Sequence, residues 1–191
     1  MSKQIWKPGA LLSPLPPILV TCGTMEQPNV LTVAWTGIIN TQPAMTYISV
    51  RPERYSYPMI RSSGEFVLNL TTANLVRAAD YCGVRTGAKT NKFNDCKITP
   101  APASTVCAPI LQESPMNLEC KVTQIIELGS HHMFLAEIQA IQVDESLLDE
   151  KGALNLQRAN LAAYAHGSYF ELGKKIGTFG YSVKKKKKRT K

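Results

Sequence analysis

Hydrophobic residues recur along this chain in short runs bounded by proline and glycine, a pattern typical of β-strands. In the run NLECKVTQIIE, Leu118, Cys120 and Val122 alternate with polar neighbours, which is the period of a strand buried on one face. Turn-forming residues such as Gln27-Pro28-Asn29 and Ser62-Ser63-Gly64 separate the runs. The pattern predicts strands at 17–23, 30–39, 45–50, 66–70, 117–127 and 133–143.

Helical patterns are fewer and shorter. One helix is predicted over 56–63 and ends at Gly64, a usual helix stop. A second is predicted over 72–82, with Thr71 or Thr72 as its N-cap. Residues 83–116 are rich in Gly, Pro, Asn, Lys and Thr and are expected to form a long loop, of the kind that is commonly functional or a partner surface.

Six or more strands with a few short helices predict a mainly β fold, most simply an antiparallel barrel that closes its own edges. The length of 191 residues, with 44% hydrophobic and 19% charged residues, fits one globular domain, which we place at 1–183. No run approaches the roughly 18–20 apolar residues that cross a bilayer. Prolines interrupt the apolar N-terminal stretch, which argues against a signal peptide, so we expect a cytoplasmic protein without membrane partners.

A formal net charge of +8 is typical of proteins that bind nucleic acid, but the positive charge of this chain is concentrated at one end, which argues against such a function. Residues 184–191 carry seven positive charges, which leaves +1 for the rest of the chain. So dense a block of like charge repels itself and predicts a disordered basic tail. The block could attract anionic polymers non-specifically, but it lacks the aromatic residues that single-strand binding usually adds, so no specific nucleic-acid partner is expected.

The five cysteines are scattered, odd in number and never spaced as CxxC. This argues against a disulfide framework and a structural zinc site, and we expect no metal. Cys22 and Cys120 lie in apolar strands and are expected to pack as small hydrophobes. Cys82 precedes Gly83 at the start of the predicted loop and is a candidate reactive thiol.

Polar side chains and an aromatic one gather between 29 and 57. An arginine fork and compact hydroxyls suit a phosphate, and a tryptophan covers an aromatic face, so the segment suggests a flat, phosphorylated ligand. The candidates are Thr32, Trp35, Thr36, Ser49, Arg51 and Ser56. Simpler interpretations stay open: Arg51 and Arg54 as solvated surface residues, Trp35 as a core aromatic, and the hydroxyls as ordinary strand residues.

Read in order, these segments resemble the flavin reductase-like proteins, the family of FMN-binding split-barrel proteins that includes the flavoredoxins. The resemblance covers most of residues 10–175. It is carried by Thr21-Cys22-Gly23, NVLTVAWTG, Pro43, YISVRPERYSY, GEFVLNL, Lys92-Phe93, LGSHHMFLAEI and YFELG. It implies a Greek-key antiparallel split barrel with a few short helices.

The resemblance also implies FMN as the cofactor and assigns its contacts. These are Thr32, Val33, Ala34, Trp35, Thr36, Ser49, Val50, Arg51, Ser56 and Tyr57, with Lys92 directed toward the phosphate. His131 matches a histidine beside the nicotinamide pocket and is the implied catalytic residue; Ser130 stands where an aspartate is usual. Tyr169 is expected to pack near the barrel.

The implied reaction is hydride transfer from NAD(P)H to the flavin, with electrons passed on to a small-molecule or protein acceptor. A homodimer is implied as well. The alternative is a flavoredoxin-like electron carrier with little NAD(P)H activity of its own. No paired carboxylates support hydrolysis, and no GxGxxG fingerprint is present.

Overall fold

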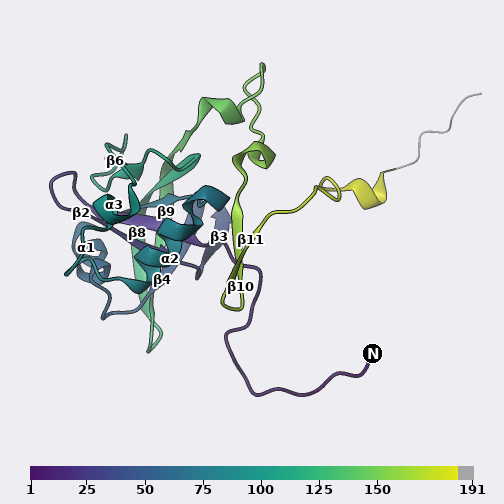
Figure 1. The fold of residues 1–191 in the computed structure, drawn as a ribbon, viewed down its shortest axis with the longest axis horizontal. Helices are drawn as coiled ribbons and strands as arrows, with labels where there is room; N and C mark the ends of the chain where they lie inside the picture. The colour runs from purple at the N-terminus through teal and green to yellow at the C-terminus, as the bar shows by residue number, and fades with distance from the viewer. Residues whose placement is uncertain (185–191) are drawn as a thin grey trace, which may run out of the picture.

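The computed structural model describes residues 1–184, and its centre is one antiparallel sheet of seven strands in the order β2-β1-β5-β8-β9-β4-β3 (Figure 1). The predicted mainly β, antiparallel architecture is confirmed. The strands are β1 Ile18–Gly23, β2 Pro28–Val33, β3 Thr36–Thr41, β4 Ala44–Val50, β5 Glu65–Asn69, β8 Met116–Glu127 and β9 His132–Val143.

The predicted strand at 30–39 is wrong in one respect, because it is two strands. β2 ends at Val33 and β3 begins at Thr36, and these strands lie at opposite ends of the sheet order. A tight turn causes the break, with the Thr36 amide donating to the Ala34 carbonyl at 3.1 Å. Only Ala34 and Trp35 connect the two edge strands, so the sheet must curl until its edges meet. We call the connection formed by Ala34 and Trp35 the β2–β3 junction.

Two helices lie where the sequence places them. α1 spans Ser56–Ser63 and ends at Gly64, whose φ of 68° suits a residue without Cβ. The 3₁₀ helix η1, Ala73–Leu75, leads into α2, Val76–Val84. Thr72 caps η1 by position, without a side-chain hydrogen bond.

The segment expected to be a long loop contains a third helix and two short strands. α3 spans Lys92–Cys96, and the Asn91 side chain caps it by accepting from the Asn94 amide at 3.2 Å. β6, Pro100–Ala101, pairs with β7, Ile110–Leu111. Nearer the C-terminus the chain forms η2 Glu145–Leu147, η3 Leu156–Ala159, β10 Ala162–Ala165, β11 Ser168–Glu171 and η4 Tyr181–Val183.

Apolar residues form two clusters because some strands are buried on both faces. One cluster includes Val20, Ile48, Phe66 and Phe134. The other, which includes Leu19, lies under α2 and α3. This explains why the first strand reads as a continuous apolar run rather than an alternating one.

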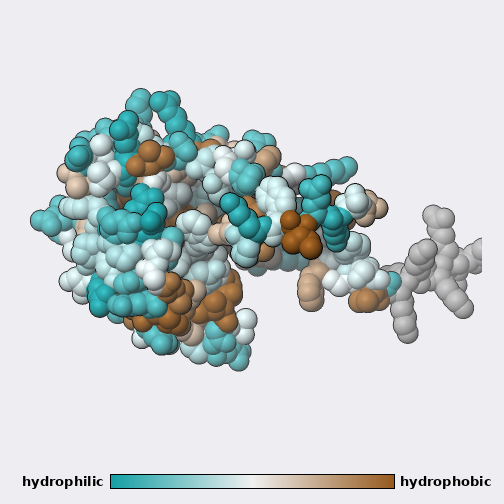
Figure 2. All heavy atoms as spheres, turned by 90° about the horizontal axis from the view of Figure 1, so that it is seen from below, coloured by the Kyte–Doolittle hydropathy of each residue, from teal (hydrophilic) through white to brown (hydrophobic). Residues whose placement is uncertain are grey.

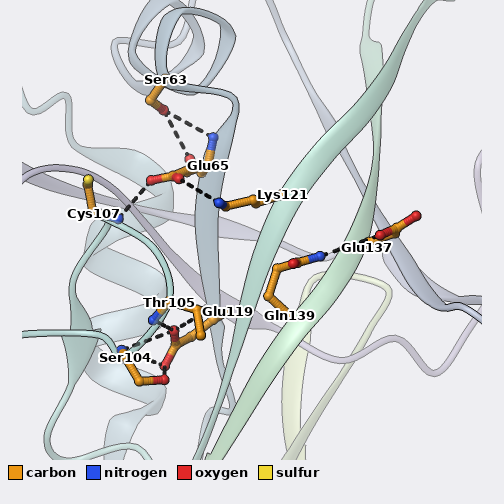
Figure 3. Close-up of polar contacts among 9 residues, drawn as sticks. All are labelled: Ser63, Glu65, Ser104, Thr105, Cys107, Glu119, Lys121, Glu137 and Gln139. Atoms are coloured by element: carbon orange, nitrogen blue, oxygen red, sulfur yellow. Dashed lines mark hydrogen bonds and ion pairs between the residues drawn. The ribbon is translucent and has the colours of Figure 1, made fainter.

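A buried carboxylate fastens residues 102–109 to the sheet (Figure 3). Glu119 of β8 is fully buried and accepts from the backbone and hydroxyls of Ser104 and Thr105 and from the Gln142 amide. These bonds outweigh burial, which alone would raise the carboxyl pKa, and lower it to about 2. At the other end of the segment, Glu65 accepts from the Cys107 amide at 2.7 Å.

The two terminal segments project from the body (Figure 1) and expose large apolar side chains, including Trp6, Leu12 and Phe179. Figure 2 shows hydrophobic residues both on the body and along the projecting part of the chain. Except for Lys184, the predicted basic tail at 184–191 lies outside the described residues. Among residues 1–184, no helix has the length and apolarity to cross a membrane.

Candidate functional site

Two adjoining cavities share Leu31, Arg51 and Arg54, and the β2–β3 junction lines the larger one. We call the larger one, of about 620 Å³, the ring cavity, and the smaller one, of about 290 Å³, the cationic cavity. The ring cavity is lined by the ends of β2 and β4, the β2–β3 junction, α2, the N-terminal segment 10–15 and the β10–β11 hairpin. The cationic cavity is lined by the β4–α1 segment, the residues after α2, and Lys92.

The ring cavity has a backbone strip on one side and aromatic groups around it. Predicted residues Thr32, Val33, Ala34, Trp35, Ser49, Val50, Arg51 and His131 all line it. Trp35 is about half exposed and meets the His131 ring edge-on, with centroids 4.9 Å apart. The β10–β11 hairpin also lines this cavity, including the predicted Tyr169. The arrangement is a slot suited to a flat, partly apolar molecule.

The cationic cavity gathers Arg51, Arg54, Arg85 and Lys92 against one carboxylate, Glu53, which pairs with Arg51 at 2.8 Å. Arg54 also donates to the Gly83 carbonyl at 2.9 Å, which fixes its position between the cavities. So many cations in a small space favour a ligand with at least two negative charges.

Ser56 and Gly87 complete this cavity. The Ser56 hydroxyl is buried and accepts from the Asn29 amide at 2.6 Å. A Cβ on Gly87 would lie 2.2 Å from Asn29 Oδ1 and 2.9 Å from the Tyr55 ring, so only glycine fits there. The cavity therefore depends on close approach of backbone and side chains.

Lys92 lines the cationic cavity but also serves the fold. Its Nζ is buried and donates to the carbonyls of Val30 at 2.7 Å and Cys82 at 3.0 Å. Burial lowers the pKa of this ammonium group. Two of its three donors thus tie β2 to α2, and one remains for a ligand.

Three predicted contacts use their hydroxyl groups inside the protein. Thr32 donates to the Ala79 carbonyl, and Thr36 donates to the Tyr47 carbonyl at 2.5 Å. Tyr57 is buried and its hydroxyl bonds His132 Nδ1 at 2.7 Å and Arg61 at 2.6 Å. Thr36 and Tyr57 line neither cavity, so the structure does not bring them to the site.

His131 stands at the turn before β9, close to the arginines. Partial burial lowers the pKa of its imidazole, and the positive charge of Arg51 lowers it further. Ser130 Oγ lies 3.0 Å from His131 Nδ1 and orients the ring in the absence of a carboxylate. The imidazole is therefore neutral at pH 7 and offers one donor and one acceptor.

Sequence reasoning missed several lining residues. Arg85 follows a helix end inside the expected loop, and Tyr164 and His166 belong to an unpredicted hairpin. His166 and Gly167 form its turn with φ of 47° and 85°, and the Gly167 turn signal could have revealed the hairpin.

Cys82 is not the loop thiol that the sequence suggested as a reactive candidate. It lies in α2, is 1% exposed, and burial raises its pKa to about 12. Cys22 and Cys120 are buried as expected. Within residues 1–184, no group of three or more His, Cys, Asp and Glu side chains is placed to hold a metal ion.

Comparisons with known proteins identify the family to which the chain is similar. The family model of the flavin reductase-like domain matches residues 12–173. An uncharacterised protein of Archaeoglobus fulgidus is 31% identical over 144 residues, which covers 75% of this chain and 81% of the relative.

Solved structures show the same fold. The flavoredoxin of Desulfovibrio vulgaris (Miyazaki F) is 31% identical, with a TM-score of 0.88 over 96% of this chain and 100% of that one. A Shewanella frigidimarina protein with a split barrel domain is 20% identical, with a TM-score of 0.78 over 88% of this chain and 86% of that one. The predicted split barrel is confirmed.

Proposed function

Because this chain belongs to the family of flavin reductase-like proteins, we propose that it is an FMN-binding oxidoreductase that transfers hydride from NAD(P)H to the flavin and passes the electrons to an acceptor. A redox role that involves a flavin follows from the family itself. The choice of FMN, the NAD(P)H donor and the residue roles are our proposal.

The observation that carries the proposal is the joining of the ring cavity to the cationic cavity through Arg51 and Arg54. FMN has the same two parts, a tricyclic ring and a phosphate with close to two negative charges, joined by a polar ribityl chain. The donor set of the cationic cavity matches the phosphate, and the slot at the β2–β3 junction matches the ring. The residues present therefore fit FMN.

In this proposal Arg51, Arg54 and Arg85 hold the phosphate with planar guanidinium donors. The hydroxyl of Ser56 adds one more hydrogen-bond donor, on a short side chain. The backbone at 32–35 and at Ser49–Val50 lies along the ring and ribityl chain. These contacts offset the cost of removing a charged phosphate from water.

FMN when bound supplies the hydride-accepting chemistry, so the chain needs no nucleophile of its own. Its residues supply proximity and orientation: Trp35 and the hairpin residues Tyr164 and Tyr169 narrow the slot and exclude water. The neutral imidazole of His131, at the cavity edge, orients the polar groups of the hydride donor.

A flavoredoxin-like electron carrier is the second candidate, favoured by the similarity to a flavoredoxin and by Ser130 in place of a carboxylate beside His131. An electron carrier would bind FMN at the same cavities but would accept electrons from a protein. NAD(P)H would then reduce the bound flavin slowly or not at all.

We also propose that the protein is a homodimer. Edge strand β3 exposes Ile38 and Ile39, and the projecting terminal segments expose Trp6 and Phe179. Burying such groups against a second copy removes apolar surface from water.

The deciding experiment is to incubate purified protein with FMN, desalt it, and add NADH without oxygen while following the visible flavin band. A retained band that bleaches within seconds supports the reductase. A retained band that NADH leaves unchanged supports the electron carrier, and loss of FMN on desalting contradicts a tight FMN site.

A further inference from the structure

A chain of hydrogen bonds joins α1 to the start of β9 and lines neither the ring cavity nor the cationic cavity. Arg61 donates to the Tyr57 hydroxyl at 2.6 Å, and this hydroxyl lies 2.7 Å from His132 Nδ1. Tyr57 is 8% exposed and the His132 side chain is 14% exposed, so water competes little for the second bond. The proposed flavin chemistry does not use these groups.

The donors and acceptors along this chain are all satisfied in one arrangement when His132 is neutral. A guanidinium group has no acceptor, so Tyr57 Oη accepts from Arg61 and gives its own hydrogen to His132 Nδ1. The imidazole then carries its hydrogen on Nε2. Glu127 Oε1 lies 3.4 Å from Arg61 and 3.8 Å from His132 Nδ1, and the second distance is too long for a hydrogen bond.

Packing holds the Tyr57 ring in place. It meets the ring of His132 edge-on at a centroid distance of 5.3 Å, and the fully buried ring of Phe134 at 5.5 Å. Its backbone amide also donates to the Arg54 carbonyl at 2.9 Å. The hydroxyl is therefore presented to His132 from a fixed position.

Both ends of the Tyr57–His132 bond adjoin residues of the candidate site. Tyr57 directly follows Ser56, which lines the cationic cavity. His132 directly follows His131 and pairs with Val50 across the sheet, and both of these residues line the ring cavity. The bond between Tyr57 and His132 thus links the two cavities through residues that touch neither.

The direction of the His131 side chain depends on its neighbour. His131 ends the turn between β8 and β9, which contains Gly129 at a φ of 89° and is closed by a bond from the Leu128 amide to the His131 carbonyl at 3.0 Å. His132 is the first residue of β9, and its side chain is anchored on Tyr57. A change at His132 would therefore rotate the backbone from which the His131 ring meets Trp35.

We propose that Tyr57 and His132 are positioning residues: their hydrogen bond, oriented by Arg61, holds the His131 imidazole edge-on against Trp35 at the ring cavity. This placement is independent of any ligand, whereas its consequence for hydride transfer rests on the proposed function. When the bond is lost, NADH should reduce bound FMN more slowly, on the order of tenfold, because the hydride donor is less well oriented. FMN affinity should stay the same, because neither residue lines a cavity.

Proton NMR of the full-length protein before addition of FMN tests the placement. The chain has three histidines, and the Hε1 resonance of His131 is assigned by its absence in His131→Gln. The edge-on Trp35 ring displaces this resonance by its ring current. Trp35→Leu gives the position without the ring current and so sets the scale.

Tyr57→Phe is the informative variant, because it removes one hydroxyl and keeps the ring that packs on Phe134. We expect the His131 resonance to move toward its position in Trp35→Leu. His132→Leu should have the same effect. His132→Asn, whose Oδ1 can accept near the position of Nδ1, should restore the wild-type resonance and the wild-type rate.

Tyr81→Phe is the matched control, because it also removes a tyrosine hydroxyl, which donates to Asp95 at 2.7 Å, and neither residue lines the ring cavity or the cationic cavity. It should leave the His131 resonance and the rate unchanged. An unchanged His131 resonance in Tyr57→Phe, or an equal shift in Tyr81→Phe, would show that the proposal is wrong. A fall in FMN affinity that matches the fall in rate would also overturn it.

The same measurements separate this proposal from the proposed function. If NADH does not reduce FMN bound to the wild-type protein, the proposed reductase is wrong. The His131 resonance still decides whether Tyr57 and His132 position that ring, because it is recorded without FMN or NADH.

Discussion

Arg51 and Arg54 connect the two parts of the candidate site, because each of them lines both cavities. The sequence singled out Arg51, Trp35 and Ser49, which line the ring cavity, because polar and aromatic side chains at strand ends are visible in the pattern. It could not show that Tyr57 turns away toward His132, because that depends on the packing of α1 against β9.

Arg51→Ala should weaken FMN binding by about 1.5 kcal/mol, or roughly tenfold. The loss is at the low end for a charge-assisted bond, because the Arg51 side chain is half exposed and already pairs with Glu53. Fluorescence titration with FMN measures the change. Arg77→Ala, an exposed arginine that lines neither cavity, should leave affinity unchanged. Equal affinities for the two variants would remove Arg51 from the phosphate site.

The His131 imidazole should titrate below its ordinary pKa of 6.5, since burial and Arg51 both disfavour the charged ring. Proton NMR of the ring should therefore show a midpoint under 6.5, with the signal assigned by its absence in His131→Gln. NADH oxidation should then be flat above pH 7 and change only on the acid side. A midpoint at or above 6.5 would mean that His131 does not lie beside these arginines.

At the scale of elements, the sequence predicted most strands and two helices well, because each is long enough for its repeat of hydrophobic positions to be visible. It missed the break at Ala34–Trp35, since the apolar run continues through it, and the division depends on which partner each half pairs with. It missed α3 because five residues show no helical period. Distant pairing partners and short elements leave little local signal.

Glu119→Gln should destabilise the fold by about 3 kcal/mol. Each carboxylate oxygen accepts several donors, so an amide nitrogen in place of either oxygen would point its hydrogens at other hydrogens. Urea denaturation measures the loss. Glu137→Gln is the control: this carboxylate of β9 accepts one long bond of 3.5 Å from Gln139 (Figure 3), and its replacement should have little effect.

The Glu119 carboxylate also determines part of the dependence of the free energy of unfolding on pH in acid. Folding lowers the Glu119 pKa from 4.5 to about 2, so its contribution is complete above about pH 4.5 and disappears as pH falls toward 2. In Glu119→Gln this acid-dependent part should be absent. Parallel stability curves for the two proteins between pH 5 and 3 would contradict the assignment.

At the scale of the whole molecule, the proposed homodimer would cover the projecting ends and the exposed face of β3. Analytical ultracentrifugation of the full chain should give a dimer. Removal of residues 1–9, which lie outside both cavities, should weaken the dimer while FMN still binds. A monomer at all micromolar concentrations would contradict the dimer and leave the site intact.

The meeting of β2 and β3 has a consequence for how the protein gains its ligand. The lining residues come from the segments 10–17, 31–35, 49–56, 80–92 and 164–169 and from His131, so no short fragment of the chain holds the complete site. Any ligand there binds only the finished fold and draws the folding equilibrium toward it, by about 2.7 kcal/mol at a concentration one hundred times the Kd. Supply of the ligand would then set how much of the newly made chain survives proteolysis in the cell.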